Sequence, residues 1–339
     1  APETAAAWPR FVWLAIGVIA AVIIAFGGRV GGTNLLGWTC IGALFLAAGV
    51  TVYFALSHDW FDASAGKFAP IQEAGRMIQL YRPSLAFPDD INANVAGGAL
   101  AALLPLGFAG LLWAASRDRP GALPFVLAFF VGVILLLLLI AGLLGLVLTA
   151  SRGAWLGTAA GIVVGAIVYS RAKRKAWPVW LDIILLVVAF GALVAVFWAA
   201  VFVPGFDRYL GSVGAAGGSA IGRAQLWREM LALAGDYPFT GVGFGATMMA
   251  HASYALLTHV GYITHAHNLF LQIAVEAGLP ALLAFLALLL VALWGIMRAP
   301  VQLFARVRRG PVRQAQRILR ARLPFRVGAA AALTALVVH

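Results

Sequence analysis

The stretch LPFVLAFFVGVILLLLLIAGLLGLVLTASRGAWLGTAAGIVVGAIVY, residues 123–169, decides the fold class of this chain. Its apolar residues follow one another continuously rather than alternating with period two, which predicts membrane-spanning helices and argues against a β-barrel. The only polar break in the stretch is the segment around Arg152, and it divides the stretch into two helices. A charge at that position is costly in a membrane, so Arg152 is expected to have a partner.

The composition of the whole chain agrees with a membrane protein. Of its 339 residues, 63% are hydrophobic and 11% are charged, whereas soluble domains carry roughly 25% charged residues. The net charge is +12, but the basic residues lie in short clusters between apolar runs, which indicates membrane topology and not nucleic-acid binding. The single cysteine, Cys40, excludes a disulfide within the chain and a cysteine-based metal site.

The apolar runs predict an all-α fold, a polytopic transmembrane helical bundle that forms one membrane domain over residues 1–339. About eight spans are expected from their lengths. They lie near residues 11–27, 35–57, 91–115, 123–149, 153–170, 177–203, 268–297 and from 326 onward, although the last run is too short to cross a bilayer.

The distribution of Lys and Arg predicts the topology. These residues concentrate in residues 171–175 and 298–326, which are therefore expected to be cytoplasmic. Alternating spans then place residues 58–90, 150–153 and 205–267 on the opposite, outer face. The basic stretch 298–326 is expected to be a solvated helix beside anionic lipids.

Both large outer loops contain a predicted amphipathic helix that would lie along the membrane surface. In the loop 58–90 it is QEAGRMIQLYRP, residues 72–83, with Arg76 and Arg82. In the loop 205–267 it carries the apolar residues Leu226, Met230, Leu231 and Leu233 and is ended by Gly235 and Pro238, with Arg223 in its first turn.

The run HAHNLFLQIAVEAG, residues 265–278, places two imidazoles, His265 and His267, where a polar loop becomes an apolar helix. A histidine at the aqueous end of a membrane helix can act as a base toward a headgroup or a lipid-linked substrate. Asn268, Gln272 and Glu276 follow at intervals of four residues and form a polar stripe. Such a stripe must face protein or water, so Gln272 and Glu276 are expected to support His267 or to pair with an arginine.

A set of basic residues is expected to line one outward cavity, namely Arg76, Arg82, Arg152, Arg223, His265 and His267. Guanidinium groups bind phosphate oxygens in bidentate fashion, which suits a pyrophosphate at the level of the headgroups. Acidic residues are few on this face, so neither a metal nor another cofactor is expected. Gly241, Gly243 and Gly245 are interpreted as a tight turn and not as a phosphate-binding loop, because no βαβ context surrounds them.

Three motifs together resemble the O-antigen ligase and polymerase superfamily of bacterial inner membranes. They are SRGAWLG (151–157), GRAQLWREMLALAGDYPFTGVGFG (222–245) and HAHNLFLQIAVEAGLPALLAF (265–285). Arg82, followed by Asn94 in INANVAGGAL, is similar to a further pattern of that family, although Asn92, Ala93 and Asn94 replace its usual Asn-Pro-Asn. The resemblance covers roughly residues 75–290.

The resemblance implies a glycosyltransferase with about twelve spans in the intact protein and a periplasmic active site. Its donor would be a glycan on undecaprenyl pyrophosphate, its acceptor a sugar of the lipid A core, and its surroundings membrane lipids. The spacing of His267 and Gly278 is similar to that of the family's histidine and glycine, which makes His267 the expected base. Arg152 and Arg223 would stabilise the leaving pyrophosphate. Expected substrate-binding residues are Arg82, Arg76, His265, Asn94 and Asn268.

Other functions remain open from the sequence alone. O-antigen polymerisation and transfer to protein Ser or Thr belong to the same superfamily and differ only in the acceptor. A transporter of a lipid-linked anion belongs to another class, but the chain lacks a convincing internal repeat. His251 and His259 are interpreted as hydrogen-bonded structural residues.

Overall fold

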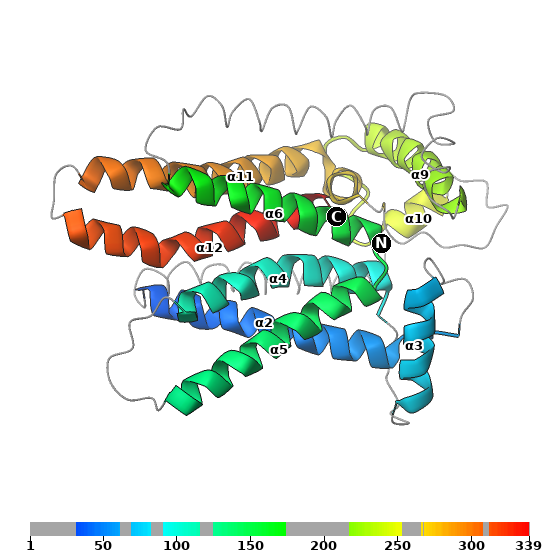
Figure 1. Ribbon diagram of the computed structural model, residues 1–339. Coiled ribbons are helices and arrows are strands. Elements are labelled where there is room, and N and C mark those ends of the chain that lie inside the picture. The colour runs from blue at the N-terminus through cyan, green and yellow to red at the C-terminus, as the bar shows by residue number, and fades with distance from the viewer. Residues whose placement is uncertain are drawn as a thin grey trace. The chain divides into compact units, whose positions relative to one another are not determined.

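The computed structural model describes residues 32–61, 69–82, 91–115, 125–173, 217–252, 266, 268–307 and 312–338. The regular elements in these residues are helices, and the described part of the chain contains no strand (Figure 1). Within the described residues, five helices are long and apolar enough to cross a membrane: Asn34–Ser57, Ala93–Ala115, Phe129–Leu148, Arg152–Tyr169 and Leu269–Ala292. The prediction of a polytopic helical bundle is therefore confirmed. The predicted spans 11–27 and 177–203 lie outside the described residues.

The chain divides into two compact units, and each is described by itself. The larger unit comprises Ile24–Lys175 and Leu293–His339, and the smaller unit Ala1–Ile23 and Ala176–Ala292. One membrane domain over residues 1–339 stays a prediction. The helices are α2 Gly32–Ser57, α3 Ala69–Tyr81, α4 Ala93–Ala115, α5 Phe125–Leu148, α6 Arg152–Lys173, α9 Gly217–Asp236, α10 Thr247–Ala252, α11 Leu269–Val307 and α12 Val312–Val338.

In the larger unit, small residues let the helices pack closely. Helix α12 lies beside α6 and α4 (Figure 1). A Cβ atom added at Gly161 of α6 would lie 2.4 Å from the carbonyl oxygen of Ala331 in α12, and one at Gly157 would lie 2.6 Å from that of Ala335. Only glycine permits this approach, which is the usual way in which membrane helices associate.

The start of helix α12 differs from that of the span expected there. The sequence predicted a span from residue 326 onward, but the helix begins at Val312 and is 27 residues long. Its first half carries four arginines, which favour helix without making it apolar, and α12 is accordingly absent from the five candidate spans. The apolar second half buries Ala330, Ala331 and Ala335.

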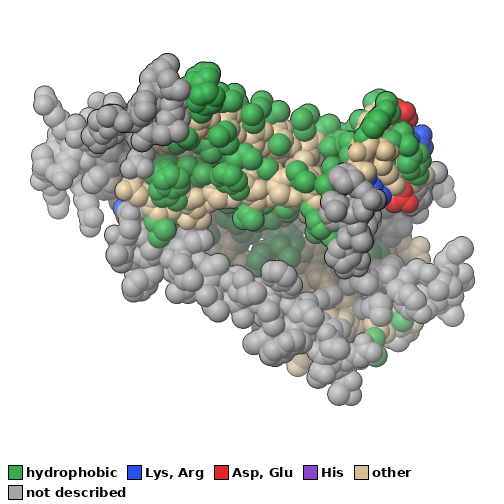
Figure 2. All heavy atoms as spheres, turned by 90° about the horizontal axis from the view of Figure 1, so that it is seen from below, with side chains coloured by type: hydrophobic (Ala, Val, Ile, Leu, Met, Phe, Trp, Pro, Cys, Tyr) green, Lys and Arg blue, Asp and Glu red, His purple; other side chains and the backbone are tan. Residues whose placement is uncertain are grey.

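The surface of the larger unit is apolar along its helices. Phe129, Leu137 and Leu144 of α5 are among its exposed side chains. In the view from below, hydrophobic side chains cover much of the described surface, and acidic side chains gather at one end (Figure 2). This is the surface that contact with lipid requires.

The helix predicted in the loop 58–90 is α3, and it lies across the end of α2 (Figure 1). Its only buried residue among those described is Gly75, where a Cβ would lie 2.0 Å from the Trp60 ring. Gln79 accepts a hydrogen bond from the backbone N–H of Trp60 at 2.6 Å. Met77, Leu80 and Tyr81 are exposed on α3.

The smaller unit is built on α9. Leu226, Met230 and Leu233 share one face of that helix and are buried against Leu271 and Val275 of α11. The prediction of this apolar face is confirmed. Helix α9 begins earlier than expected, at Gly217, so Arg223 lies in the second turn and not in the first.

Candidate active site

The polar stripe of α11 faces the protein. Glu276 is buried, and its Oε1 accepts hydrogen bonds from the Thr247 hydroxyl at 2.9 Å, the Gln272 amide at 2.8 Å and the backbone N–H of Gly245 at 3.1 Å. The Gln272 amide also donates to the Thr247 hydroxyl at 3.0 Å. These contacts agree with the expectation that the stripe avoids lipid.

The loop between α9 and α10 folds tightly against α11. Gly241, Gly243 and Gly245 all have positive φ, at 62°, 103° and 80°, which side chains other than glycine rarely adopt. The backbone N–H groups of Val242 and Gly243 donate to the carbonyls of Val275 and Glu276, at 2.8 and 3.1 Å. The glycine series is therefore a tight turn, as predicted.

Helix α11 is broken at Gly278, which the sequence had placed inside one continuous span. Gly278 has φ 80° and ψ 173°, and the two halves of the helix run in different directions (Figure 1). The Leu279 N–H donates to the Pro238 carbonyl at 2.7 Å, and a Cβ at Gly278 would lie 2.5 Å from the Phe239 oxygen. The close approach of this loop explains why the break occurs at a glycine.

The same network fixes the backbone on both sides of position 267. The N–H of Ala266 donates to Gln272 Oε1 at 2.6 Å, and the indole of Trp227 in α9 donates to the Ala266 carbonyl at 3.0 Å. Asn268 caps α11, because its Oδ1 accepts from the Leu271 N–H at 3.0 Å. His265, His267 and the side chain of Arg223 lie outside the described residues.

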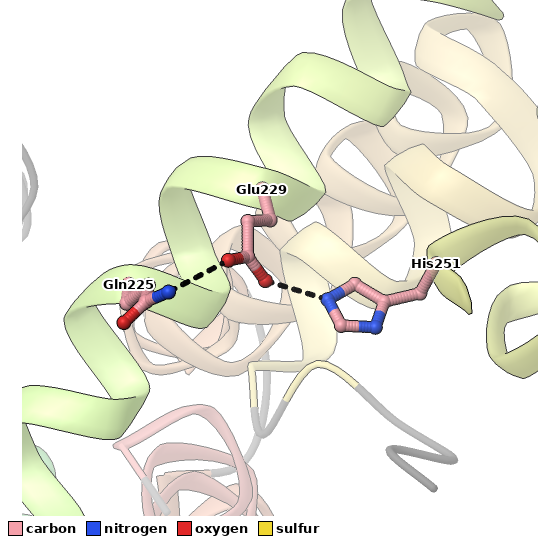
Figure 3. A network of polar contacts seen from close by, with 3 residues as sticks. All are labelled: Gln225, Glu229 and His251. Atoms are coloured by element: carbon pink, nitrogen blue, oxygen red, sulfur yellow. Dashed lines mark hydrogen bonds and ion pairs between the residues drawn. The ribbon is translucent and has the colours of Figure 1, made fainter. Parts of the chain in front are cut away.

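A second polar cluster in the smaller unit was missed by the sequence reasoning. The buried His251 of α10 donates from Nε2 to Glu229 Oε2 of α9 at 2.7 Å, and Gln225 donates to the other carboxylate oxygen at 3.0 Å (Figure 3). Residues 229 and 251 lie on different helices, so no periodic spacing signals the contact. His251 is a hydrogen-bonded structural residue, as interpreted, and His259 lies outside the described residues.

In the larger unit, the first turns of α4 and α6 meet. Asn92 caps α4 by accepting from the N–H of Asn94 at 2.8 Å. Ser151 caps α6 by accepting from the N–H of Ala154 at 3.5 Å, and its hydroxyl donates to Asn94 Oδ1 at 3.0 Å. The structure thus brings the expected site residue Asn94 to Ser151, directly before the half-buried Arg152. Two positive helix ends and a guanidinium favour an anion here.

The other two expected arginines make contacts within the larger unit. Arg82 donates from Nη1 to the carbonyls of Leu56 and His58, the latter at 3.3 Å, and so caps the C-terminus of α2. Arg76 forms an ion pair with Glu73 in α3 at 3.6 Å. Their role in binding substrate stays a prediction.

The expected site residues are divided between the units. Arg76, Arg82, Asn94 and Arg152 belong to the larger unit, and Arg223, His265, His267, Asn268, Gln272 and Glu276 to the smaller one. Among the residues that the structure describes, no group of three His, Cys, Asp or Glu side chains is arranged to hold a metal.

Comparison with known families supports the resemblance seen in the motifs. Residues 136–286 match the family described as O-antigen ligase. The match supports membership of the O-antigen ligase superfamily. The matched segment includes Arg152, Arg223 and position 267, together with the turn 241–245 and the polar stripe of α11. The family match confirms the resemblance that three sequence motifs had indicated, and it indicates a glycosyltransferase-like ligase or polymerase. No curated protein matches the chain.

Proposed function

We propose that this chain is an inverting, metal-independent glycosyltransferase of the bacterial inner membrane. It transfers an O-antigen glycan from undecaprenyl pyrophosphate to a sugar of the lipid A core on the periplasmic face. The family match supports the reaction class. The observation that supports the mechanism is the fixing of Ala266 by Trp227 and Gln272, next to the proposed base.

In the proposed reaction, His267 takes the proton of the acceptor hydroxyl. As the proton leaves, the hydroxyl oxygen forms a bond to the anomeric carbon, and the bond from that carbon to the pyrophosphate breaks. General-base catalysis of this kind contributes roughly 10² to 10⁴ in rate, provided that the base is held within hydrogen-bond reach. Direct displacement from the opposite side inverts the anomeric carbon.

The pyrophosphate gains negative charge as it leaves. Arg152, at the start of α6, and Arg223, in α9, would stabilise that charge electrostatically, with Arg82 as a further ligand. The donor would also contact Arg76, His265, Asn94 and Asn268. Fixed guanidinium groups favour the transition state because they need no reorganisation during the reaction.

The test uses the purified full chain in phospholipid vesicles with lipid-linked donor, compared with His267→Ala and with His259→Ala as the matched control. With lipopolysaccharide that lacks O-antigen, we expect glycan-bearing lipid A core from the wild type and the control. His267→Ala should lose roughly 10² to 10⁴ in rate while still binding donor. Unchanged product formation by His267→Ala would remove the proposed base.

The acceptor is decided in parallel reactions of the same preparation. Growth of the donor glycan without lipid A core would assign a polymerase, and glycan on a pilin-like protein would assign a protein O-oligosaccharyltransferase. Donor that crosses the bilayer without a new bond would assign a transporter. Each of these outcomes contradicts the proposed ligase reaction.

A further inference from the structure

Three aromatic side chains project from the turn between α9 and α10. This turn, residues 237–244, is called here the aromatic loop. Tyr237, Phe239 and Phe244 are 47%, 79% and 48% exposed, although the loop backbone is held firmly by α11. The apolar residues Leu226, Met230 and Leu233 of the preceding helix α9 are, by contrast, buried in the core of the smaller unit. Exposed aromatic side chains on an ordered turn indicate a contact surface.

The aromatic loop is hydrogen-bonded to one short segment of α11, residues 275–279. Its three backbone hydrogen bonds to that helix involve Val275, Glu276 and Leu279. Phe239 therefore lies beside Gly278, where the regular helix is interrupted. The height of Gly278 relative to a bilayer determines what surrounds the aromatic side chains.

The character of α11 changes at Gly278. Before it, Leu271, Ala274, Val275 and Glu276 are buried in the smaller unit. After it, the helix exposes apolar side chains, with Leu283 and Leu288 at 66% and 69%. The run from Leu279 to Met297 carries no charge and ends at Arg298, and at 1.5 Å per residue it matches a hydrocarbon thickness of about 30 Å. The hydrocarbon boundary that fits these observations is Gly278, not Leu269.

The alternative boundary at Leu269 conflicts with the surroundings of the loop. It would place the carboxylate of Glu276 and the irregular backbone of residues 238–243 within the hydrocarbon. Exposed irregular backbone is not found there, because its polar groups have no partner in lipid. Thr240 and Asp236 beside the aromatic side chains are exposed as well, and both need water or headgroups.

We propose that the aromatic loop is a membrane anchor, whose partner is the interfacial layer of the phospholipid bilayer. Tyr237, Phe239 and Phe244 insert among the headgroups and set the boundary of the hydrocarbon at Gly278. Tyrosine is enriched at this depth in membrane proteins because its ring combines apolar area with a polar hydroxyl, and Phe239 and Phe244 add apolar area beside Tyr237. The network of Gln272, Thr247 and Glu276 then lies on the headgroup side of the boundary. This inference rests on the membrane character of the chain and not on the reaction proposed above.

The depth of the loop can be measured with spin labels. Because Cys40 is the only cysteine, Cys40→Ala provides a background for single-cysteine variants of the full chain. Phe239→Cys and Phe244→Cys report on the loop, and Leu288→Cys reports on the hydrocarbon. Ala232→Cys reports on water, because Ala232 shares the exposed face of α9 with Arg228 and Asp236. Each variant is labelled with a nitroxide in vesicles of phosphatidylethanolamine and phosphatidylglycerol.

The depth of each nitroxide label is obtained by comparing how often it collides with oxygen and how often with a water-soluble nickel complex. We expect labels at 239 and 244 to lose most of the nickel accessibility seen at 232, while they gain less oxygen accessibility than the label at 288. Nickel accessibility equal to that at 232 would place the loop in water and overturn the proposal. A depth equal to that at 288 would place the loop in hydrocarbon and overturn it too. Two loop positions keep the test decisive if one variant fails to fold.

Discussion

Single hydrogen bonds decide how the backbone beside the proposed base is held. The Trp227 indole N–H donates to the carbonyl of Ala266, and the Gln272 amide oxygen accepts from the backbone N–H of the same residue. Sequence reasoning predicted the stripe to which Gln272 belongs, because intervals of four residues place side chains on one face. It did not predict the role of Trp227, because a contact between α9 and a residue 39 positions later in the chain has no local signal.

Trp227→Phe tests this positioning. The substitution removes the N–H that binds the Ala266 carbonyl and keeps an aromatic ring of similar shape. We expect kcat to fall by about tenfold, the equivalent of about 1.4 kcal/mol, with KM nearly unchanged, because substrate contacts remain while the backbone before His267 loses a restraint.

The matched control is Trp60→Phe, which removes a similar indole bond to the Ala55 carbonyl at 3.1 Å. Steady-state kinetics over a pH series should show reduced kcat for Trp227→Phe alone, with the shape of the profile retained. Equal losses of kcat in Trp227→Phe and Trp60→Phe would show that the loss reflects general packing and not the positioning of the backbone before His267.

Asp59 gives the larger unit a contribution to stability that depends on pH. The Gln79 amide donates to its carboxylate at 3.0 Å and the Phe61 N–H at 3.1 Å, and these hydrogen bonds, Gln79 first, lower the pKa of Asp59. Because the folded pKa lies below the unfolded one, the contribution is present above about pH 4 and is lost as the pH falls through the folded pKa.

Hydrogen exchange should therefore show α3 opening more often as the pH falls below about 4, with a smaller change in Asp59→Asn than in the wild type. Glu73→Gln is the control, since it removes an exposed carboxylate from the same helix. An unchanged response of α3 in Asp59→Asn would assign the acid effect to other groups.

Helix boundaries were predicted well where composition changes sharply. The spans 35–57, 91–115, 123–149 and 153–170 agree with helices in the larger unit, because long uncharged runs leave a membrane chain few alternatives. The break at Gly278 was not predictable in the same way. Its cause is the Phe239 carbonyl, which tertiary structure brings from a distant loop to within 2.5 Å of where a Cβ would lie. The basic stretch 298–326 was predicted to be a solvated helix separate from the last apolar run, and the structure joins its end to that run in the one helix α12.

Close packing of α6 on α12 is the interaction most sensitive to a single methyl group. Gly161→Ala would place its Cβ against the Ala331 carbonyl, so the helices must separate, at a cost of roughly 1–3 kcal/mol. Gly132→Ala in α5 is the control, because a Cβ there meets nothing within 4 Å.

Thermal unfolding in detergent should show a lower midpoint for Gly161→Ala, whereas Gly132→Ala should unfold at or slightly above the wild-type midpoint, because alanine favours helix. If Gly161→Ala and Gly132→Ala unfold at the same temperature, the packing of α12 does not depend on the close approach of Gly161 to Ala331.

For the whole molecule, the proposed reaction requires residues from both compact units in one site. Arg152 begins α6 in the larger unit, and position 267 precedes α11 in the smaller unit. The topology predicted from Lys and Arg places both on the periplasmic face, and a shared donor pyrophosphate would have to contact both. The distance between positions 152 and 267 in the membrane therefore tests the proposed reaction.

Cross-linking measures that distance in the membrane. In the Cys40→Ala background, cysteines at positions 152 and 268 should be joined by a short bifunctional maleimide added outside intact spheroplasts, because both positions would face the donor. Cysteines at positions 152 and 309 form the control pair, since residue 309 belongs to the basic stretch predicted to be cytoplasmic. If both cysteines of the first pair react singly and are never joined, Arg152 and His267 act on different molecules, and the shared site is wrong. A cross-link that bound donor prevents would show that the donor contacts positions 152 and 268, because the donor excludes the reagent from a site it occupies.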